Sequence, residues 1–320
     1  MTVVSGIIFS PEEGALIADE QSSNQGRKYD IAQKLHDYSL EGSPVKAVMG
    51  GSGYADFLHA VNLRVEDRIK SKKPEEIPNG EAMANFIGGR TLAVKLDYLD
   101  NYLRTNLGLG WTDFKAGTFK DEDGQVRPIE PSLMENYRSL MAGGRDERLN
   151  FIHNNGFLLM TYEPSKVKLF TLSSTLTKPI QTPRPYESIG SGSDMADQVL
   201  YSFFENLPRE KRNSVDSIEG LAALLHATER ASAMNTGVGG IPYLTIIKDG
   251  ELIKPSESNS KLAAEIVKAD KKGLLKEGFY RPALGSLLYK GENFEDVEKE
   301  MYANAKDQPA LNRMLRGYKA

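Results

Sequence analysis

Two pairs of short apolar runs open the chain, and they constrain its fold more than any other feature. Residues 2–9 and 14–19 are rich in β-branched and other apolar side chains, and the sequence SPEE at 10–13 supplies a turn between them. A second pair of runs, at about 31–38 and 45–49, is likewise separated by turn residues. Each pair predicts an antiparallel hairpin, so the N-terminal part must build β-sheet.

Helical and strand patterns alternate in the rest of the chain. In order, they predict a helix from Tyr54, a helix over 83–107, strands at 156–163, 166–172 and 186–189, helices at 194–206 and 216–234, and a strand at 241–248. Two stacked antiparallel sheets between helical layers satisfy this order. We therefore predict an α+β fold, namely a four-layer αββα sandwich.

Two stretches fall outside this alternation. Residues 108–150 are rich in Gly, Asp, Glu and Pro and lack a sustained period, which indicates an insertion. Residues 251–320 alternate charged and apolar residues in short helical patterns and carry no strand signal. We expect one main domain over 2–250, with the insertion at about 108–150, followed by a helical C-terminal extension over 251–320.

The composition excludes several kinds of chemistry. Because the chain has no cysteine, it has no disulfide, no thiol nucleophile and no thiolate metal site. Its histidines are scattered without metal-ligand spacing, and no phosphate loop ending in Gly-Lys-Ser or Gly-Lys-Thr occurs. We therefore expect neither a metal nor a cofactor, and nucleophilic chemistry must fall to a hydroxyl, an amine or a carboxylate.

Net charge and hydropathy limit the classes of partner and the cellular location that we expect. A net charge of −4 gives no electrostatic reason to expect a nucleic acid as partner. The apolar runs are far shorter than the roughly 20 residues that a membrane-spanning helix needs, and the first residues lack the pattern of a secretory signal. We expect a cytoplasmic protein that binds neither nucleic acid nor membrane.

The position of Thr2 points to a nucleophile. Thr2 follows Met1 directly and starts the first strand, so removal of Met1, which a small second residue permits, would make it the chain terminus. Thr2 would then carry a hydroxyl and an α-amine, whose reference pKa of about 7.7 to 8.0 suits proton relay near neutral pH. One residue could thus supply both nucleophile and base.

Several short motifs follow Thr2 in a characteristic order. They are TVVSGI at 2–7, GALIADEQSS at 14–23, Lys34, GSGYAD at 51–56 and IGSGS at 189–193. In order and approximate spacing, this set resembles the proteasome β-subunit family of N-terminal nucleophile hydrolases. The stretch DEQ at 19–21 is also similar to the peptidase subunit of the bacterial two-component ATP-dependent protease. The resemblance covers roughly residues 2–58 and 186–248.

The resemblance implies a catalytic role for each of five residues. Thr2 is the nucleophile, and Asp19 orients Lys34 and the surroundings of the nucleophile. The Lys34 cation lowers the pKa of the threonine hydroxyl or helps to shuttle its proton. The Gly51 N–H faces the tetrahedral oxyanion, and Ser191 forms a hydrogen bond near the terminal amine.

Other positions are less firmly fixed by the resemblance. Lys28 competes with Lys34 for the lysine role, and Asp19 has the alternative of an ordinary turn aspartate. The backbone of Ser23 resembles the position that pairs with an extended substrate chain, while Ser22 and His36 border the pocket for the residue before the cut. These assignments predict a polar substrate pocket.

The chain departs from the family pattern in two respects. The family has an aspartate and a serine three residues apart ahead of a glycine, whereas this chain has RASAMNTG at 230–237. Ser232, Asn235 and Thr236 are therefore the candidate substitutes. The insertion at about 108–150 and the extension from 251 also exceed the usual family domain, so ring packing could be altered.

The leading functional hypothesis is a threonine-type peptidase that cleaves peptides or proteins after removal of Met1. If the resemblance extends to assembly, identical subunits form a ring that is supplied by a separate ATPase unfoldase. Two alternatives stay open. One is an amidase or acyl transferase that acts on a specific substrate with the same fold. The other is a catalytically inactive, proteasome-like structural subunit.

Overall fold

Two five-stranded antiparallel sheets form the centre of the molecule. The computed structural model describes residues 2–20, 22–24, 27–29, 34–141, 150–174, 178–235 and 238–316. In spatial order, the first sheet contains β12 (Tyr186–Ile189), β1 (Val4–Ser10), β2 (Glu13–Ala18), β13 (Tyr243–Lys248) and β14 (Glu251–Ile253). The second contains β11 (Ile180–Gln181), β10 (Lys166–Ser173), β9 (Gly156–Glu163), β6 (Lys46–Ser52) and β5 (Leu35–Ser39).

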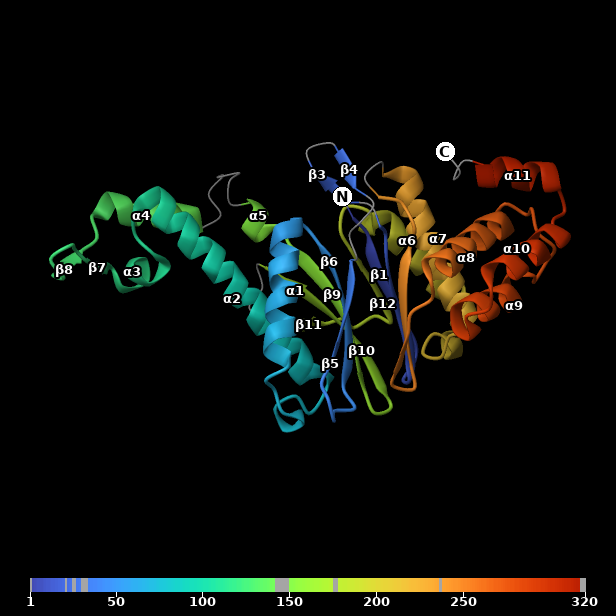
Figure 1. Cartoon of the computed structure of the whole chain (residues 1–320), viewed down its shortest axis with the longest axis horizontal. Coiled ribbons are helices and arrows are strands. Elements are labelled where there is room, and N and C mark those ends of the chain that lie inside the picture. Colours follow the sequence, from blue (N-terminus) through green and yellow to red (C-terminus); the bar gives the residue numbers. More distant parts are fainter. Residues whose placement is uncertain are drawn as a thin grey trace.

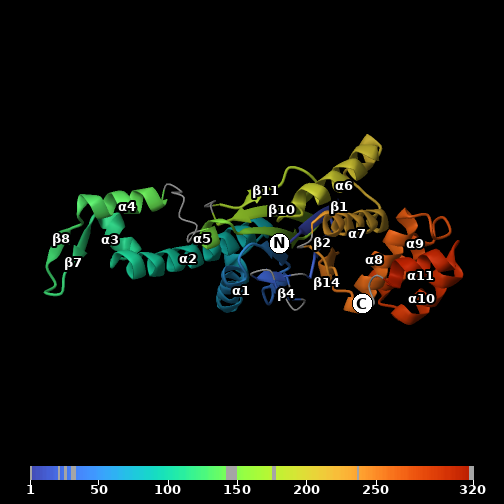
Figure 2. The same ribbon diagram turned by 90° about the horizontal axis from the view of Figure 1, so that it is seen from above.

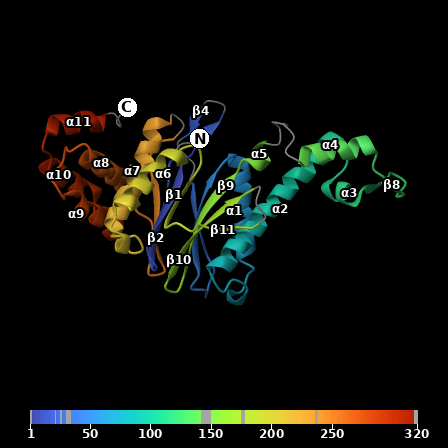
Figure 3. The same cartoon turned by 180° about the vertical axis from the view of Figure 1, so that it is seen from behind.

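Helices cover the outer face of each sheet (Figures 1 and 3). On one side, α1 (Ala55–Ile69) and α2 (Gly80–Leu107) bury apolar residues against the second sheet. On the other side, α6 (Ser193–Asn206) and α7 (Ser217–Met234) do the same against the first sheet. A third apolar cluster lies between the two sheets. The four-layer αββα sandwich that the sequence predicted is therefore confirmed.

Strand β2 shows why short apolar runs specify this arrangement. Successive side chains of a strand point to opposite faces of its sheet. Leu16 and Ala18 contact the cluster between the sheets, whereas Ala15 and Ile17 contact the cluster under α7. Because both faces are covered, the run is apolar at almost every position rather than alternating.

Strand β2 ends at Ala18, and Asp19 and Glu20 follow directly. The hairpin turn places β1 alongside β2, with Val4 opposite Ala18. Thr2 and Val3 therefore lie beside Asp19 at the same edge of the sandwich. The register of this hairpin brings the chain's first residues to the residues that follow the second strand.

An arm extends from the sandwich at the end of α2 (Figures 1 and 2). It contains α3 (Trp111–Ala116), the hairpin of β7 (Thr118–Lys120) and β8 (Val126–Pro128), and α4 (Pro131–Met141), whereas α5 (Asn150–His153) lies back beside the sandwich. These elements share a small apolar core of Leu99, Leu103, Phe114, Ile129 and Ile152. The sequence indicated an insertion here but not its short helices and strands.

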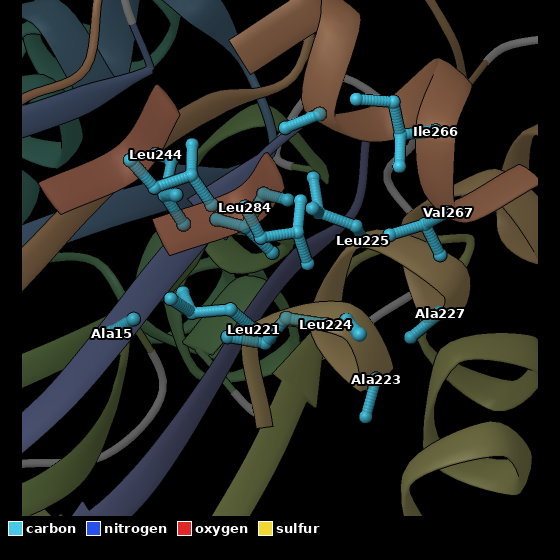
Figure 4. Packing of buried hydrophobic residues seen from close by; sticks show 14 of the residues in the cluster. Ala15, Leu221, Ala223, Leu224, Leu225, Ala227, Leu244, Ile266, Val267 and Leu284 are labelled. Atoms are coloured by element: carbon cyan, nitrogen blue, oxygen red, sulfur yellow. The ribbon is translucent and has the colours of Figure 1, made fainter. Parts of the chain in front are cut away.

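The C-terminal part packs against α7 through α8 (Glu257–Lys271), as the labelled residues Leu225, Ile266 and Val267 show in Figure 4. Helices α9 (Tyr280–Gly285), α10 (Phe294–Ala303) and α11 (Gln308–Arg316) follow, with a π-helical turn at Ser286–Lys290 after α9. Most of the described residues after 256 are therefore helical. Strand β14, which precedes them, was not predicted by the sequence pattern.

No helix within the described residues combines the length and the apolarity that crossing a bilayer requires. Among the same residues, no three acidic or histidine side chains are grouped so that they could hold a metal ion.

Candidate active site

Thr2 lies at the start of the first sheet with only 9% of its surface exposed. Its backbone N–H donates to Ser191 Oγ at 3.2 Å, and its carbonyl accepts from the Gly192 N–H at 3.3 Å. The loop between β12 and α6 therefore forms hydrogen bonds with both the N–H and the carbonyl of Thr2. This contact joins two of the motifs that the sequence singled out, although 189 positions separate them.

Lys34 and Asp19 meet Thr2 at this point. Lys34 Nζ donates to Asp19 Oδ1 at 2.8 Å and to Thr2 Oγ1 at 3.1 Å. The side chains of Lys34 and Asp19 are only 8% and 1% exposed. One ammonium thus links a buried carboxylate to the threonine hydroxyl, which is the arrangement that the family resemblance implied for these three residues.

Burial acts on both members of this ion pair. It lowers the pKa of Lys34, and the Asp19 charge and hydrogen bond oppose that effect. Burial raises the pKa of Asp19, opposed by Lys34 and by the N–H groups of Val3 and Gly239. A lysine with a lowered pKa exchanges its proton more readily near neutral pH than a solvated lysine does.

Gly190 allows the close approach of the loop to Thr2. Its φ is +99°, and a Cβ at this position would lie 2.2 Å from the Thr2 carbonyl oxygen and 3.0 Å from Ser52 Oγ. Only glycine tolerates this backbone conformation and this contact. The same measurement shows that the end of β6, where Ser52 lies, passes close to Thr2.

Gly51 precedes Ser52 on β6 and pairs with Phe157 of β9. The turn that follows is held by Asn155, whose Oδ1 accepts from the Tyr54 N–H at 2.8 Å. Gly53, with φ +138°, makes room for that amide, because a Cβ there would lie 2.3 Å from Asn155 Oδ1. Asn155 was missed by the sequence reasoning, since an asparagine before a strand carries no motif.

The residues expected to border the substrate lie apart from these contacts or outside the described side chains. Ser22 and Ser23 belong to the short strand β3 (Ser22–Asn24), which pairs with β4 (Arg27–Tyr29), and Ser23 lies opposite Lys28. Their side chains lie outside the described part of the structure. His36 on β5 is partly exposed, and its Nδ1 lies 3.9 Å from Glu66 Oε1 on α1. Their roles stay predictions.

The three candidate substitutes for the family's aspartate and serine have different positions. Asn235 Nδ2 donates to the Ser191 carbonyl at 3.0 Å, so Asn235 supports the loop that holds Thr2. Ser232 lines a separate cavity between α7 and α8. Thr236 lies outside the described residues. Of these three, Asn235 is the one that a described contact connects to the site.

Comparison with solved structures identifies the fold. No family model matches the chain, and no curated protein matches its sequence. Anbu (ancestral beta-subunit) from Yersinia bercovieri superposes with a TM-score of 0.56 at 12% identity, covering 85% of this chain and 94% of that one. Anbu from Pseudomonas aeruginosa, solved as a helical assembly, gives 0.55 at 14% identity with the same coverage.

A third structure spans nearly the whole chain. A Gly-1 mutant of Anbu from Hyphomicrobium sp. strain MC1 matches with a TM-score of 0.52 at 13% identity and covers 96% of this chain and 99% of that one. At such identities the similarity concerns the fold, and function must be argued from the site. This chain therefore has the proteasome-like N-terminal nucleophile hydrolase fold of the Anbu proteins.

Proposed function

We propose that this chain is a threonine-type peptidase whose nucleophile is Thr2 after removal of Met1. The observation that carries the proposal is the position of Lys34 Nζ, 3.1 Å from Thr2 Oγ1 and 2.8 Å from Asp19 Oδ1. A nucleophile, a proton-carrying group and a residue that orients that group form the general pattern of covalent catalysis by a hydroxyl.

The reaction follows from these contacts. Thr2 Oγ1 attacks the peptide carbonyl, its proton passes to the α-amine or through Lys34, and a C–O bond forms. The C–N bond then breaks, the amine product leaves with a proton, and an ester to Thr2 stays behind. Water activated by the α-amine hydrolyses that ester and restores the hydroxyl. The Gly51 N–H is our candidate to stabilise the oxyanion.

Ser191 supports this mechanism through the other end of Thr2. Its Oγ accepts a hydrogen bond from the Thr2 nitrogen at 3.2 Å. Once Met1 is removed, that nitrogen is the α-amine, and a hydroxyl at this distance orients its protons. Asn235 in turn donates to the Ser191 carbonyl at 3.0 Å. Its amide therefore takes over part of the support that the family gains from an aspartate.

We also propose that the active form is a homo-oligomer in the cytoplasm, acting on peptides or unfolded proteins, with a separate ATPase as unfoldase. The solved helical assembly of the Anbu complex from Pseudomonas aeruginosa supports self-assembly of this fold. A ring or helix of identical subunits would shield the sites from folded proteins. Sedimentation velocity would give a mass several times that of the 35.4 kDa chain.

Intact mass spectrometry tests the nucleophile. The protein isolated from its own cells is measured before and after incubation with a peptide epoxyketone, which reacts with both the hydroxyl and the amine of a terminal threonine. We expect loss of Met1 and one adduct, which Thr2→Ala abolishes. Retention of Met1 without an adduct would overturn the proposal and favour an inactive structural subunit.

Product analysis separates hydrolysis from acyl transfer. If the adduct forms, the protein is incubated with a peptide substrate and an excess of a free amine. Hydrolysis yields a free carboxylate at the cut, whereas an acyl transferase yields the ligated amide. The proposed peptidase gives the carboxylate as the main product.

A further inference from the structure

Glu20 is a buried carboxylate that the mechanism above does not use. It follows Asp19 directly, is only 8% exposed, and its Oε2 accepts a hydrogen bond from the Ile241 N–H at 2.8 Å. Glutamate is rarely this buried unless its charge is matched by donors or cations. The position of Glu20 therefore requires a physical reason.

Asp19 and Glu20 together hold one loop, residues 238–242 between α7 and β13. Asp19 Oδ2 accepts from the Gly239 N–H at 3.3 Å, and Glu20 accepts from the Ile241 N–H two residues later. Gly240 lies between the two donors with φ +83°, and a Cβ there would lie 2.8 Å from Glu20. The loop thus fits closely against both carboxylates.

The loop and Glu20 also border open space. Residues 239–242 and Glu20 line a cavity of about 350 Å³, together with residues of α7 and α8 such as Leu225 and Ala264. Where open space borders a backbone segment, hydrogen bonds rather than packing fix the position of that segment. Without Glu20, the Ile241 N–H would lose its acceptor. The loop would then hold the Gly239 N–H less firmly against Asp19.

Glu20 also acts on Lys34 through its charge. After Asp19, it contributes a further negative charge that raises the pKa of Lys34 against the effect of burial. The titratable and charged groups that surround Glu20 are Asp19 beside it, Lys34 ahead of β5, Tyr243 on β13, Glu229 on α7, and Lys261 and Glu265 on α8. Among these, Lys34 is the cation in contact with Thr2.

We propose that Glu20 is a positioning residue for the reaction at Thr2, because it fixes the 239–241 loop on Asp19 and carries a negative charge directly after the carboxylate that pairs with Lys34. This inference rests on the peptidase function proposed above. It assigns to Glu20 a role that acts through Asp19 and Lys34 and not through substrate.

Two substitutions distinguish the effect of the Glu20 charge from its effect as a hydrogen-bond acceptor for the loop. Glu20→Gln keeps an oxygen that accepts from the Ile241 N–H but removes the charge, whereas Glu20→Ala removes both. Glu229→Gln is the matched control, since Glu229 lines the same cavity but pairs with Lys268 on α8 at 3.3 Å. Each variant is compared with the wild-type chain for thermal stability, so that a folding defect is recognised.

The first measurement follows Lys34 directly. The protein is labelled with ¹³C at lysine Cε, the Lys34 signal is assigned with Lys34→Arg, and its shift is recorded against pH. Removal of a nearby negative charge favours the neutral amine, so Glu20→Gln moves the Lys34 titration to lower pH. Glu229→Gln leaves it in place. An unchanged titration in Glu20→Gln overturns the charge part of the proposal.

The second measurement follows reactivity. The rate constant for inactivation by the peptide epoxyketone is determined across pH. In Glu20→Gln the limb that reports Lys34 moves to lower pH while the maximum rate changes about twofold at most. In Glu20→Ala the maximum also falls, by about 10- to 100-fold, because a loose loop displaces the catalytic groups. Wild-type rates in Glu20→Ala would overturn the anchoring part.

These measurements can refute the Glu20 proposal separately from the peptidase proposal. The Lys34 titration requires no turnover, so it judges Glu20 even in a chain that forms no adduct. If the wild-type protein reacts and both Glu20 variants react and titrate as it does, the peptidase proposal stands and the Glu20 inference falls. If the wild-type protein never reacts, the peptidase proposal falls, and with it the part of Glu20 in a reaction.

Discussion

At the scale of single residues, the site depends on an ion pair that is shielded from water. Lys34 and Asp19 are 2.8 Å apart and almost fully buried. Removing charges from water is costly, and each member of such a pair is tolerated because the other is present. The pair therefore links the proposed chemistry at Thr2 to the stability of the edge where β1 and β2 meet.

A double-mutant cycle measures this dependence. Asp19→Asn or Lys34→Met alone leaves the other charge buried without its partner, so each should lower the free energy of unfolding by about 3 to 5 kcal/mol. The double variant should cost clearly less than the sum, because neither charge is left. Urea unfolding of the four proteins checks this, and additive losses would show that the two side chains do not depend on each other.

Gly190 offers a second test at this scale. Gly190→Ala places a methyl group 2.2 Å from the Thr2 carbonyl oxygen at φ +99°. It should therefore reduce epoxyketone labelling of Thr2 at least about tenfold, besides the roughly 1 to 3 kcal/mol of backbone strain. Gly273→Ala is the control, since its φ is +69° and nothing lies within 4 Å. Equal labelling in both variants would contradict the role of the close contact.

Among the residues of the candidate site, those that belong to the sequence motifs lie close together in the structure. Thr2, Asp19, Lys34 and Ser191 fall in the family's order, and the structure brings their atoms together. The Gly239 N–H was not found, because a backbone donor 220 positions from Asp19 has no side-chain signature. Long-range support of this kind depends on tertiary packing alone.

At the scale of elements, the sandwich and the arm have separate apolar cores. Helix α2 begins against the second sheet, where Met83 and Ile87 are buried, and continues into the arm, where Leu99 and Leu103 are buried. Long periodic segments such as this helix were predicted well. The hairpin of β7 and β8 was not, because three-residue strands are too short to show a period.

Hydrogen exchange distinguishes the two cores. Phe114 is 2% exposed and stacks on Tyr137 with ring centroids 4.6 Å apart, so Phe114→Ala should remove about 3 to 5 kcal/mol of local stability. Amide exchange should then accelerate in α3 and α4 but not in β1 and β2. Phe57→Ala, in the core under α1, should accelerate exchange in the sheets. Faster exchange of β1 in Phe114→Ala would indicate one cooperative unit.

At the scale of the whole molecule, the C-terminal part contributes to the same core as the sheet that begins after Thr2. The cluster that contains Ile7 and Phe9 of β1 extends through Leu221 of α7 to Leu284 and Met301 near the C-terminus. The sequence placed a helical extension after residue 250 but gave no sign of this shared core. Periodicity shows that a helix has an apolar face, whereas the partner of that face depends on the tertiary fold.

Truncation tests whether the main domain folds without the C-terminal helices. A stop after residue 250 removes α8 to α11 and uncovers buried residues of α7 such as Leu224 and Leu225, so this chain should be insoluble. A stop after Lys306 removes only two buried leucines among the described residues, Leu311 and Leu315. At about 1.5 to 3 kcal/mol for each leucine, that loss lies within the usual stability of a domain, so this shorter chain should fold with a lower midpoint of thermal unfolding. Calorimetry of both truncated chains tests these expectations, and cooperative unfolding of the 1–250 fragment would show that the sandwich folds without the C-terminal helices.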